Sequence, residues 1–154
     1  MLKIKSLLPV VVSMGLISFS PISSATLLGN AGDYNAFMFG SFNSNASDTE
    51  GRVAAGGDVS LSNYSVGLKS DPTTYSLVSG GNVTYQPGSV SNGGTFASGN
   101  VNIGNHYIAG DVTAAGSVNY LAGGTVTGTV TSGSGDPAPI DFAQAYSNSI
   151  NTFG

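Results

Sequence analysis

The sequence predicts an all-β protein of the β-solenoid (β-helix-like) class, a stack of short strands with an N-terminal aromatic cap strand and a C-terminal helix. Glycine accounts for 23 of the 154 residues, charged residues for only 8%, and hydrophobic residues for 40%. A step of Gly, then Asp, Asn, Ser or Thr, then Val occurs eight times, starting at Gly57, Gly81, Gly88, Gly99, Gly110, Gly116, Gly124 and Gly128. Such a composition favours repeated strands and turns over collagen, coiled coil or disorder.

A longer form of this repeat sets the expected coil length. It occupies residues 53–61, 77–85 and 96–103, with a weaker copy at 112–120. The glycines at equivalent positions, Gly57, Gly81, Gly99 and Gly116, are 24, 18 and 17 residues apart. Because many solenoid repeats are about 20 residues or longer, we expect one coil per interval, with valines inside.

Local rules give the expected roles of the corner and of the longest interval. We expect Gly56 and Gly57 to permit a sharp bend and Asp58 to bond its own local backbone. Residues 63–75, which include Asp71-Pro72, are expected to leave the stack as a loop.

Residues 1–25 have the layout of a secretory signal peptide. Lys3 and Lys5 precede an apolar stretch at residues 7–19, and Ser23 and Ala25 are the small residues expected before a cut after Ala25. The apolar stretch is interrupted and shorter than the roughly 20 residues that span a bilayer, so a retained anchor is the weaker alternative. We therefore expect a mature domain at residues 26–154 that is secreted or held at the cell surface, without membrane insertion.

The two ends of the mature chain depart from the repeat. Residues 34–42 are rich in aromatic side chains and are expected to form a cap strand over the open end of the stack, the alternative being an exposed aromatic binding strip. Residues 43–47 are expected to form a polar loop.

A linker at residues 132–139 precedes a predicted helix with Asp141 as its N-cap. The apolar residues of this helix share one face at helical spacing, namely Phe142, Ala143, Tyr146 and Ile150. Because the helix ends with the chain, we expect the domain to be C-terminally incomplete.

Charge and cysteine content exclude several functions. The net charge is −4, and without Lys3 and Lys5 two basic residues remain against eight acidic ones, a net charge of −6. This balance opposes binding to nucleic acid or to anionic membranes, which requires clustered Lys or Arg. Cysteine is absent, which excludes thiol catalysis and thiolate metal sites.

Several segments together resemble the choice-of-anchor A domain family. They are LGNAGDYN at residues 28–35, Phe37 with Phe39-Gly40, DTEGRVAAGGDV at 48–59 and Ile140-Asp141-Phe142. The resemblance extends over residues 28–153. It implies an exported bacterial surface protein, in a family where C-termini carry different sorting signals and some members are described as adhesins with links to collagen binding. The family supplies no established catalytic residues.

The charged cluster of Asp48, Glu50 and Arg52 is not repeated along the chain, which makes these residues binding candidates. Asp48 and Glu50, with asparagines nearby, are also candidate ligands for Ca²⁺ as a cofactor, since Ca²⁺ takes oxygen ligands from flexible loops. The favoured alternative is an internal pair of Glu50 with Arg52. Tyr64, Tyr85 and Tyr107 are further candidates, as exposed aromatic anchors on an extended face.

Catalysis is not expected. His106 is the only histidine and is expected in a turn or on the surface. Asp58 and Asp111 occupy steps where Asn and Ser stand in other copies, which favours a corner role over the carboxylate pair of a carbohydrate-active enzyme. We expect a non-catalytic surface or matrix interaction module that binds a matrix protein or a glycan. The alternatives are a structural surface-layer protein and an ice-binding protein, the latter because of the threonine-rich residues 125–131.

Overall fold

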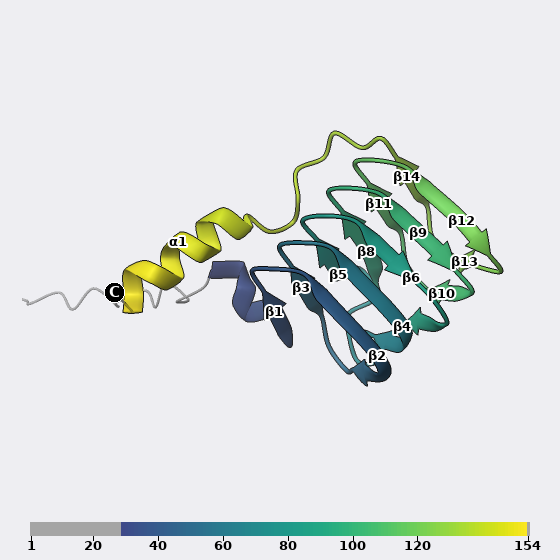
Figure 1. Cartoon of the computed structure of the whole chain (residues 1–154), viewed down its shortest axis with the longest axis horizontal. Coiled ribbons are helices and arrows are strands. Elements are labelled where there is room, and N and C mark those ends of the chain that lie inside the picture. Colours follow the sequence, from purple (N-terminus) through teal and green to yellow (C-terminus); the bar gives the residue numbers. More distant parts are fainter. Residues whose placement is uncertain (1–28, 154) are drawn as a thin grey trace, which may run out of the picture.

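The computed structural model describes residues 29–153 (Figure 1). The predicted signal peptide at residues 1–25 lies outside the described residues. The described part is a β-solenoid of about five coils followed by one helix, which confirms the predicted fold class. A short 3-10 helix, η1 (Gly29–Asp33), precedes the first strand.

One wall of the solenoid is a parallel sheet of six strands, here called the first sheet. In spatial order its strands are β1 (Ala36–Met38), β3 (Val53–Ala55), β5 (Tyr75–Ser79), β8 (Gly94–Ala97), β11 (Val112–Ala114) and β14 (Val130–Ser132). Each strand pairs in parallel with its neighbours, so the strands mark successive coils (Figure 1).

The other two walls belong to a second parallel sheet that divides into two limbs. Two long strands, β2 (Phe42–Thr49) and β4 (Val59–Val66), span both limbs. Beyond β4 the first limb continues as β6 (Val83–Tyr85), β9 (Val101–Gly104) and β12 (Val118–Ala122). The second limb continues as β7 (Gly88–Val90), β10 (His106–Ile108) and β13 (Thr125–Val126).

The strand register confirms the predicted coil lengths. Val59, Val83, Val101 and Val118 are successive partners along the first limb, and they are spaced by the same 24, 18 and 17 residues as the repeat glycines. The extra length of the first interval, 24 residues from Val59 to Val83, lies in a loop at residues 67–74. The predicted loop at 63–75 begins too early, because residues 63–66 continue β4 and pair with its neighbours.

The core fills the space between the three walls. Along each strand alternate side chains point inward, and equivalent positions in successive coils form columns of Val, Leu, Ile and Tyr. Val53, Leu61, Leu77 and Ile103 are fully buried. Burial of each such side chain contributes about 1.5–3 kcal/mol, so stacking of coils is what makes the short strands stable.

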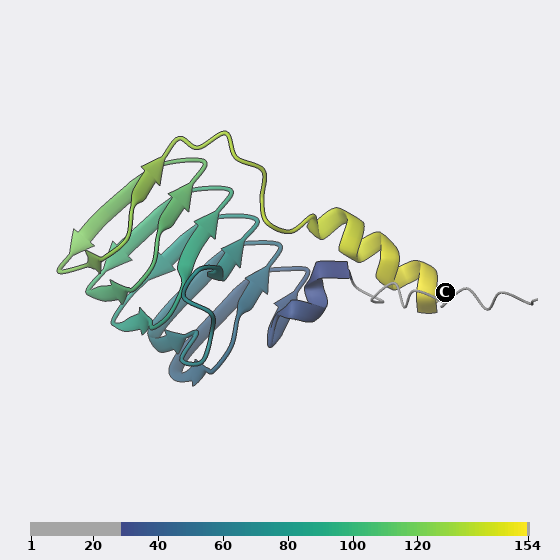
Figure 2. The same cartoon turned by 180° about the vertical axis from the view of Figure 1, so that it is seen from behind.

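A second apolar layer covers the outside of the first sheet. Ala54, Val78 and Phe96 point outward from this sheet and pack against Ile140. After β14 the chain turns back along the stack and leads into helix α1 (Phe142–Phe153) (Figure 2). The rings of Phe37 and Phe142 stack with centroids 5.5 Å apart, which fixes the start of the helix against the first coil.

The predicted helix and its N-cap are confirmed, but most of its apolar face is exposed. Asp141 Oδ1 accepts a hydrogen bond of 2.9 Å from the backbone N–H of Gln144. Phe142 is half-buried, whereas Ala143, Tyr146 and Ile150 are exposed. The reason is geometric: only the start of the helix lies against the stack, and the rest extends away from it (Figure 1).

The N-terminal part of the stack also differs from its prediction. Residues 34–42 do not form one cap strand, because β1 ends at Met38 and the chain turns a corner before β2 begins at Phe42. Residues 43–47, predicted as a polar loop, lie within β2 and pair with β4. Their backbone groups bond to the next coil regardless of their polar side chains, which explains the difference.

Candidate binding face

The outward side chains of the first limb form a regular polar column. The register places five of them at equivalent positions in successive coils, namely Asn43, Ser60, Thr84, Asn102 and Asn119. Neighbouring strands lie about 4.7–4.9 Å apart, so this strand column offers one polar side chain at each such step. Asn119 Nδ2 donates a hydrogen bond of 3.0 Å to Asn102 Oδ1 within the column.

A second column, the corner column, lies two residues earlier in each coil and consists of Asp58, Asn82, Asn100 and Ser117. Asp58 Oδ1 accepts a hydrogen bond of 2.7 Å from the backbone N–H of Asn82. Asn82 Oδ1 accepts one of 2.9 Å from Asn100, and Asn100 Oδ1 one of 2.8 Å from Ser117. The predicted local bond of Asp58 is therefore wrong, since each side chain bonds to the next coil.

The glycine before each corner residue is required by this ladder. A Cβ atom on Gly99 would lie 2.5 Å from Asn82 Oδ1, and those on Gly81 and Gly116 would lie closer still to the oxygens of Asp58 and Asn100. The predicted bend at Gly56 and Gly57 is present, and a Cβ atom on Gly57 would lie 2.6 Å from Ser41 Oγ, whereas one on Gly56 would lie closer still to Phe39 O. None of these glycines has a positive φ, so glycine is required here by the neighbouring coil rather than by a left-handed backbone. Glycine recurs in the Gly-X-Val step because neighbouring coils approach too closely at this position to leave room for a side chain.

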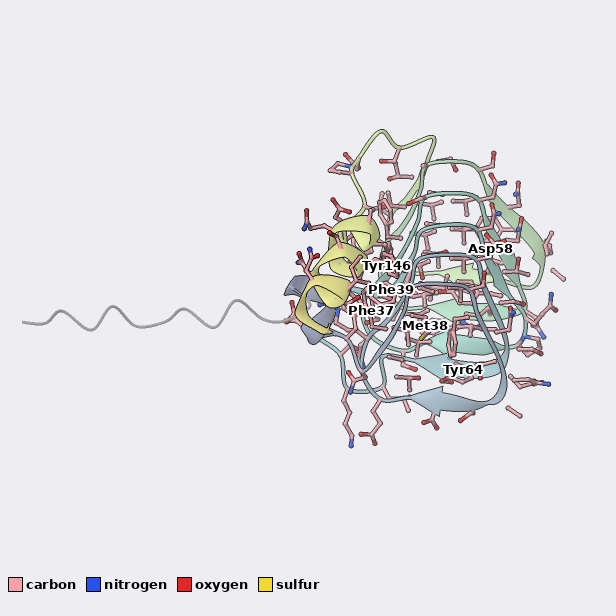
Figure 3. The ribbon with its side chains drawn as sticks, turned by 60° about the vertical axis from the view of Figure 1, so that its left-hand side comes forward. Phe37, Met38, Phe39, Asp58, Tyr64 and Tyr146 are labelled. Carbon is pink, nitrogen blue, oxygen red and sulfur yellow. The ribbon has the colours of Figure 1, made fainter. Side chains whose placement is uncertain are left out.

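A shallow depression of about 500 Å³ lies between the two columns. We call it the polar trough. Its lining residues are Ser41, Asn43, Asp58, Val59, Ser60, Asn82, Thr84, Asn100 and Asn102. In Figure 3, Asp58 lies on the side of the stack remote from helix α1, whereas Phe37, Phe39 and Tyr146 gather beside the helix. The trough is therefore not obstructed by the C-terminal segment.

The charged cluster predicted at Asp48, Glu50 and Arg52 is separated in the structure. Glu50 forms an exposed ion pair with Lys69 Nζ at 2.8 Å, so the predicted Glu50 to Arg52 pair is wrong. The loop at residues 67–74 supplies this lysine, which the sequence alone did not place beside Glu50. Asp48 is exposed on the second limb, where its register partner in the next coil is Ser65.

Arg52 has a structural role beside Tyr34. Its Nη2 donates a hydrogen bond of 2.7 Å to the Tyr34 hydroxyl, and its guanidinium carbon lies 4.2 Å from the centre of that ring. Its Nε donates a bond of 2.9 Å to the carbonyl oxygen of Tyr75. Burial raises the pKa of Tyr34, and the charge of Arg52 opposes this rise.

Two of the three tyrosines proposed as anchors are core residues. Tyr64 and Tyr85 are buried because alternation along their strands turns them inward, so the prediction that they are exposed is wrong. Their hydroxyls bond to threonines, Tyr64 to Thr49 Oγ1 at 2.6 Å and Tyr85 to Thr95 Oγ1 at 2.7 Å. Burial also raises the pKa of Tyr85. Tyr107 is exposed, but it lies on the second limb, away from the trough columns.

His106 is also a core residue, contrary to the prediction of a surface or turn histidine. Its ring stacks on Tyr85 with centroids 4.1 Å apart, and its Nδ1 lies 2.7 Å from the carbonyl oxygen of Gln86. Burial lowers the pKa of His106, and the bond to Gln86 opposes this shift. Its Nε2 is buried and makes no hydrogen bond within the described part of the chain.

The acidic residues considered for chemistry lie at different corners. Asp58 belongs to the corner column, whereas Asp111 precedes β11 of the first sheet and accepts a 2.7 Å hydrogen bond from the backbone N–H of Thr129. Within residues 29–153, no group of three or more His, Cys, Asp or Glu side chains is placed to hold a metal ion.

The threonine-rich residues 125–131 are distributed over several faces. Thr125 lies on the second limb beside Tyr107, and Thr131 lies on the first sheet beside Thr113. Between them, Thr127 Oγ1 donates a 2.6 Å bond to the carbonyl oxygen of Ala109. In this structure the regular outward rows are built from mixed Asn, Ser and Thr side chains.

A β-solenoid with an open polar face is the architecture of a repeat protein that binds through an extended surface. The model of the family described as "Putative Ice-binding-like adhesive domain" matches residues 27–153, so the chain belongs to this adhesive family. A search of curated proteins and a search of solved structures each found no match. The family match supports the adhesin-like character that the sequence predicted, and the narrower choice-of-anchor A assignment stays a prediction.

An adhesive family of this kind is non-enzymatic in character. In the part of the chain that the structure describes, neither helix has the length and apolar composition needed to cross a membrane.

Proposed function

We propose that the protein is an exported, non-catalytic adhesive module whose polar trough binds a hydroxyl-rich glycan. The observation that carries the proposal is the pair of parallel columns, with one polar side chain per coil at a spacing of about 4.7–4.9 Å. Along each strand the two columns are offset by two residues, or about 6.6–6.8 Å. This grid suits a ligand that also repeats its hydroxyl groups.

The trough holds polar groups that remain available to a ligand. The hydroxyls of Ser60 and Thr84 and the Nδ2 group of Asn100 make no hydrogen bond to the described residues, whereas the Asn100 Oδ1 is already used by the ladder. Each new hydrogen bond adds only about 0.5–1.5 kcal/mol, so affinity would come from several coils acting on one long ligand.

A glycan fits the trough better than a matrix protein does. Protein interfaces are usually anchored by Trp, Tyr or Arg side chains that fill central pockets. Tyr64 and Tyr85 are buried in the core, and Arg52 is engaged by Tyr34. The trough itself is lined by small polar residues with a single carboxylate, that of Asp58.

Ice binding is the second candidate, because the family description includes it and the same regular grid could order water. A flat row of threonines, as considered from residues 125–131, does not supply the grid in this structure, so the trough would have to do so through mixed Asn, Ser and Thr side chains.

Export and surface attachment are part of the proposal. The signal-peptide pattern at residues 1–25, the adhesive family and the resemblance to choice-of-anchor A domains all support them. Ca²⁺ at Asp48 and Glu50 has less support, since Glu50 is paired with Lys69.

The test is a binding comparison on cellulose, chitin, collagen and growing ice crystals, using the exported chain after natural processing. Thr84→Arg places a large side chain in the trough, and Thr125→Arg places the same side chain on the second limb as a matched control. We expect saturable binding to a polysaccharide. Thr84→Arg should weaken this binding by about tenfold or more, which corresponds to a loss of about 1.4 kcal/mol of binding free energy. Thr125→Arg should leave the affinity unchanged. Binding to collagen alone, to ice alone, or equal loss in both variants would refute the glycan proposal.

A further inference from the structure

The last coil of the solenoid ends in unpaired strand edges. Among the described residues, β12 pairs only with β9, β13 only with β10, and β14 only with β11. After β14 the chain turns back along the stack toward α1, so it does not cross this end (Figures 1 and 2). A free edge presents a row of N–H and C=O groups that another strand can pair with.

The side chains at this end occupy core positions that lack a covering coil. Tyr120 is 53% exposed, although its register equivalents Ile103 and Tyr85 are 0% exposed. Val130 is 39% exposed, whereas its partner Val112 is 0% exposed. With Leu121, 58% exposed, these residues form an apolar surface that we call the terminal patch.

The terminal patch lacks the features that usually protect an edge. Natural edge strands commonly carry Lys, other charged residues or Pro. Residues 112–135 contain no charged residue and no proline. A register shift between Tyr120 and Ala122 is the one irregularity in the edge strands.

The absence of charge indicates which partner fits this surface. When a surface meets its own copy, residues near the two-fold axis face the same residues of the partner, so a charge there would repel its copy and an uncharged patch favours self-association. The rest of the chain is acidic, with a net charge of −4. The opposite end of the stack carries Asp48 in its edge strand β2 and Glu50 just after it, so it is less suited to self-contact.

We propose that two copies of this chain associate end to end through their terminal patches. A two-fold axis between them makes the interface isologous and sets facing edge strands antiparallel. Pairing would satisfy the free edges of the last coil and bury Tyr120, Leu121 and Val130. The proposal does not depend on what the polar trough binds.

The first test measures the mass of the exported chain across a range of concentrations by light scattering and analytical ultracentrifugation. We expect a concentration-dependent dimer, and Tyr120→Lys should weaken self-association at least about tenfold by placing like charges at the interface. Tyr107→Lys is the matched control, because Tyr107 has a similar exposure of 45% but lies on the second limb. A thermal melt checks that both variants are folded.

Cysteine cross-linking provides the second test, since the chain contains no cysteine. Leu121→Cys should give a disulfide-linked dimer under mild oxidation, whereas Tyr107→Cys should not. A wild-type chain that stays monomeric up to about 100 µM, well above the Kd of a specific dimer, would overturn the proposal. So would equal effects of the two lysine variants, or cross-linking through Tyr107→Cys alone.

Discussion

The substitution Gly99→Ala tests whether close contact between coils is the reason for glycine in the Gly-X-Val repeat. The added methyl carbon would lie 2.5 Å from Asn82 Oδ1 and 3.0 Å from the carbonyl carbon of Gly81. Asn82 must then move, which breaks its 2.9 Å hydrogen bond to the backbone N–H of Asn100. The variant therefore probes the ladder through a residue that makes no side-chain contact of its own.

The magnitude follows from three contributions. Overpacking against the preceding coil costs about 1–3 kcal/mol. Loss of the Asn82 hydrogen bond costs about 0.5–1.5 kcal/mol. The lower backbone entropy of alanine in the unfolded chain offsets about 0.4–1 kcal/mol. We expect Gly99→Ala to lower the free energy of unfolding by about 2 kcal/mol, measured by urea denaturation.

A double-mutant cycle separates this explanation from a general intolerance of alanine. In the Asn82→Ala background the obstructing oxygen is gone, so Gly99→Ala should cost much less, a coupling of about 1–2 kcal/mol. Gly135→Ala is the control, because no atom lies within 4 Å of the added carbon there. An unchanged cost of Gly99→Ala in the Asn82→Ala background would refute the ladder explanation.

Two further predictions concern His106 and the helix cap. Burial lowers the pKa of His106 in the folded chain below its usual 6.5. As the pH decreases, the unfolded chain therefore binds a proton at His106 before the folded chain does. The contribution of neutral His106 to the free energy of unfolding is complete above about pH 6.5 and is lost as the pH falls toward the folded pKa. Urea midpoints between about pH 7.5 and about pH 5.5 should decrease for the wild type and decrease less for His106→Phe, and equal slopes would contradict the assignment. Asp141→Ala removes the acceptor for the Gln144 N–H, at a cost of about 1 kcal/mol to the helix. Hydrogen exchange should then accelerate in α1 and not in the strands, whereas the exposed control Asp136→Ala should leave both unchanged.

The coil spacing was predictable because a solenoid must return each residue type to an equivalent place. Val59, Val83 and Val101 recur at the intervals that the strand register confirms. The burial of Tyr85 could also have been predicted, because it lies two residues after Val83 and its side chain therefore points to the same, inner side of the strand. Tyr107 lies one residue before the buried Ile108, so its side chain points outward. The prediction that Tyr64 and Tyr85 are exposed anchors was based on their aromatic side chains and did not consider which side of the strand each side chain faces.

Other features depend on contacts between coils, which local sequence does not specify. The role of Gly99 follows from Asn82 in the preceding coil, and the partner of Glu50 is Lys69, carried by a loop. The sequence did contain one indication that the outer side of the first sheet is covered. Val53-Ala54-Ala55 has no polar residue, as expected for a strand buried on both faces. That pattern could have indicated that a segment such as residues 138–142 packs on the outside.

The covering of the first sheet and the ladder together support the polar trough as the proposed binding surface. Ile140 and Phe142 pack over the outer side of the first sheet, so the two limbs of the second sheet present the open walls of the stack. On the first limb, the oxygens of Asn82 and Asn100 are held by the next coil, which orients the rest of each amide. A ligand that repeats with the coils would meet side chains already ordered by the fold, so little entropy is lost on binding. The bonds that stabilise the stack therefore also set the spacing of the polar groups along the trough.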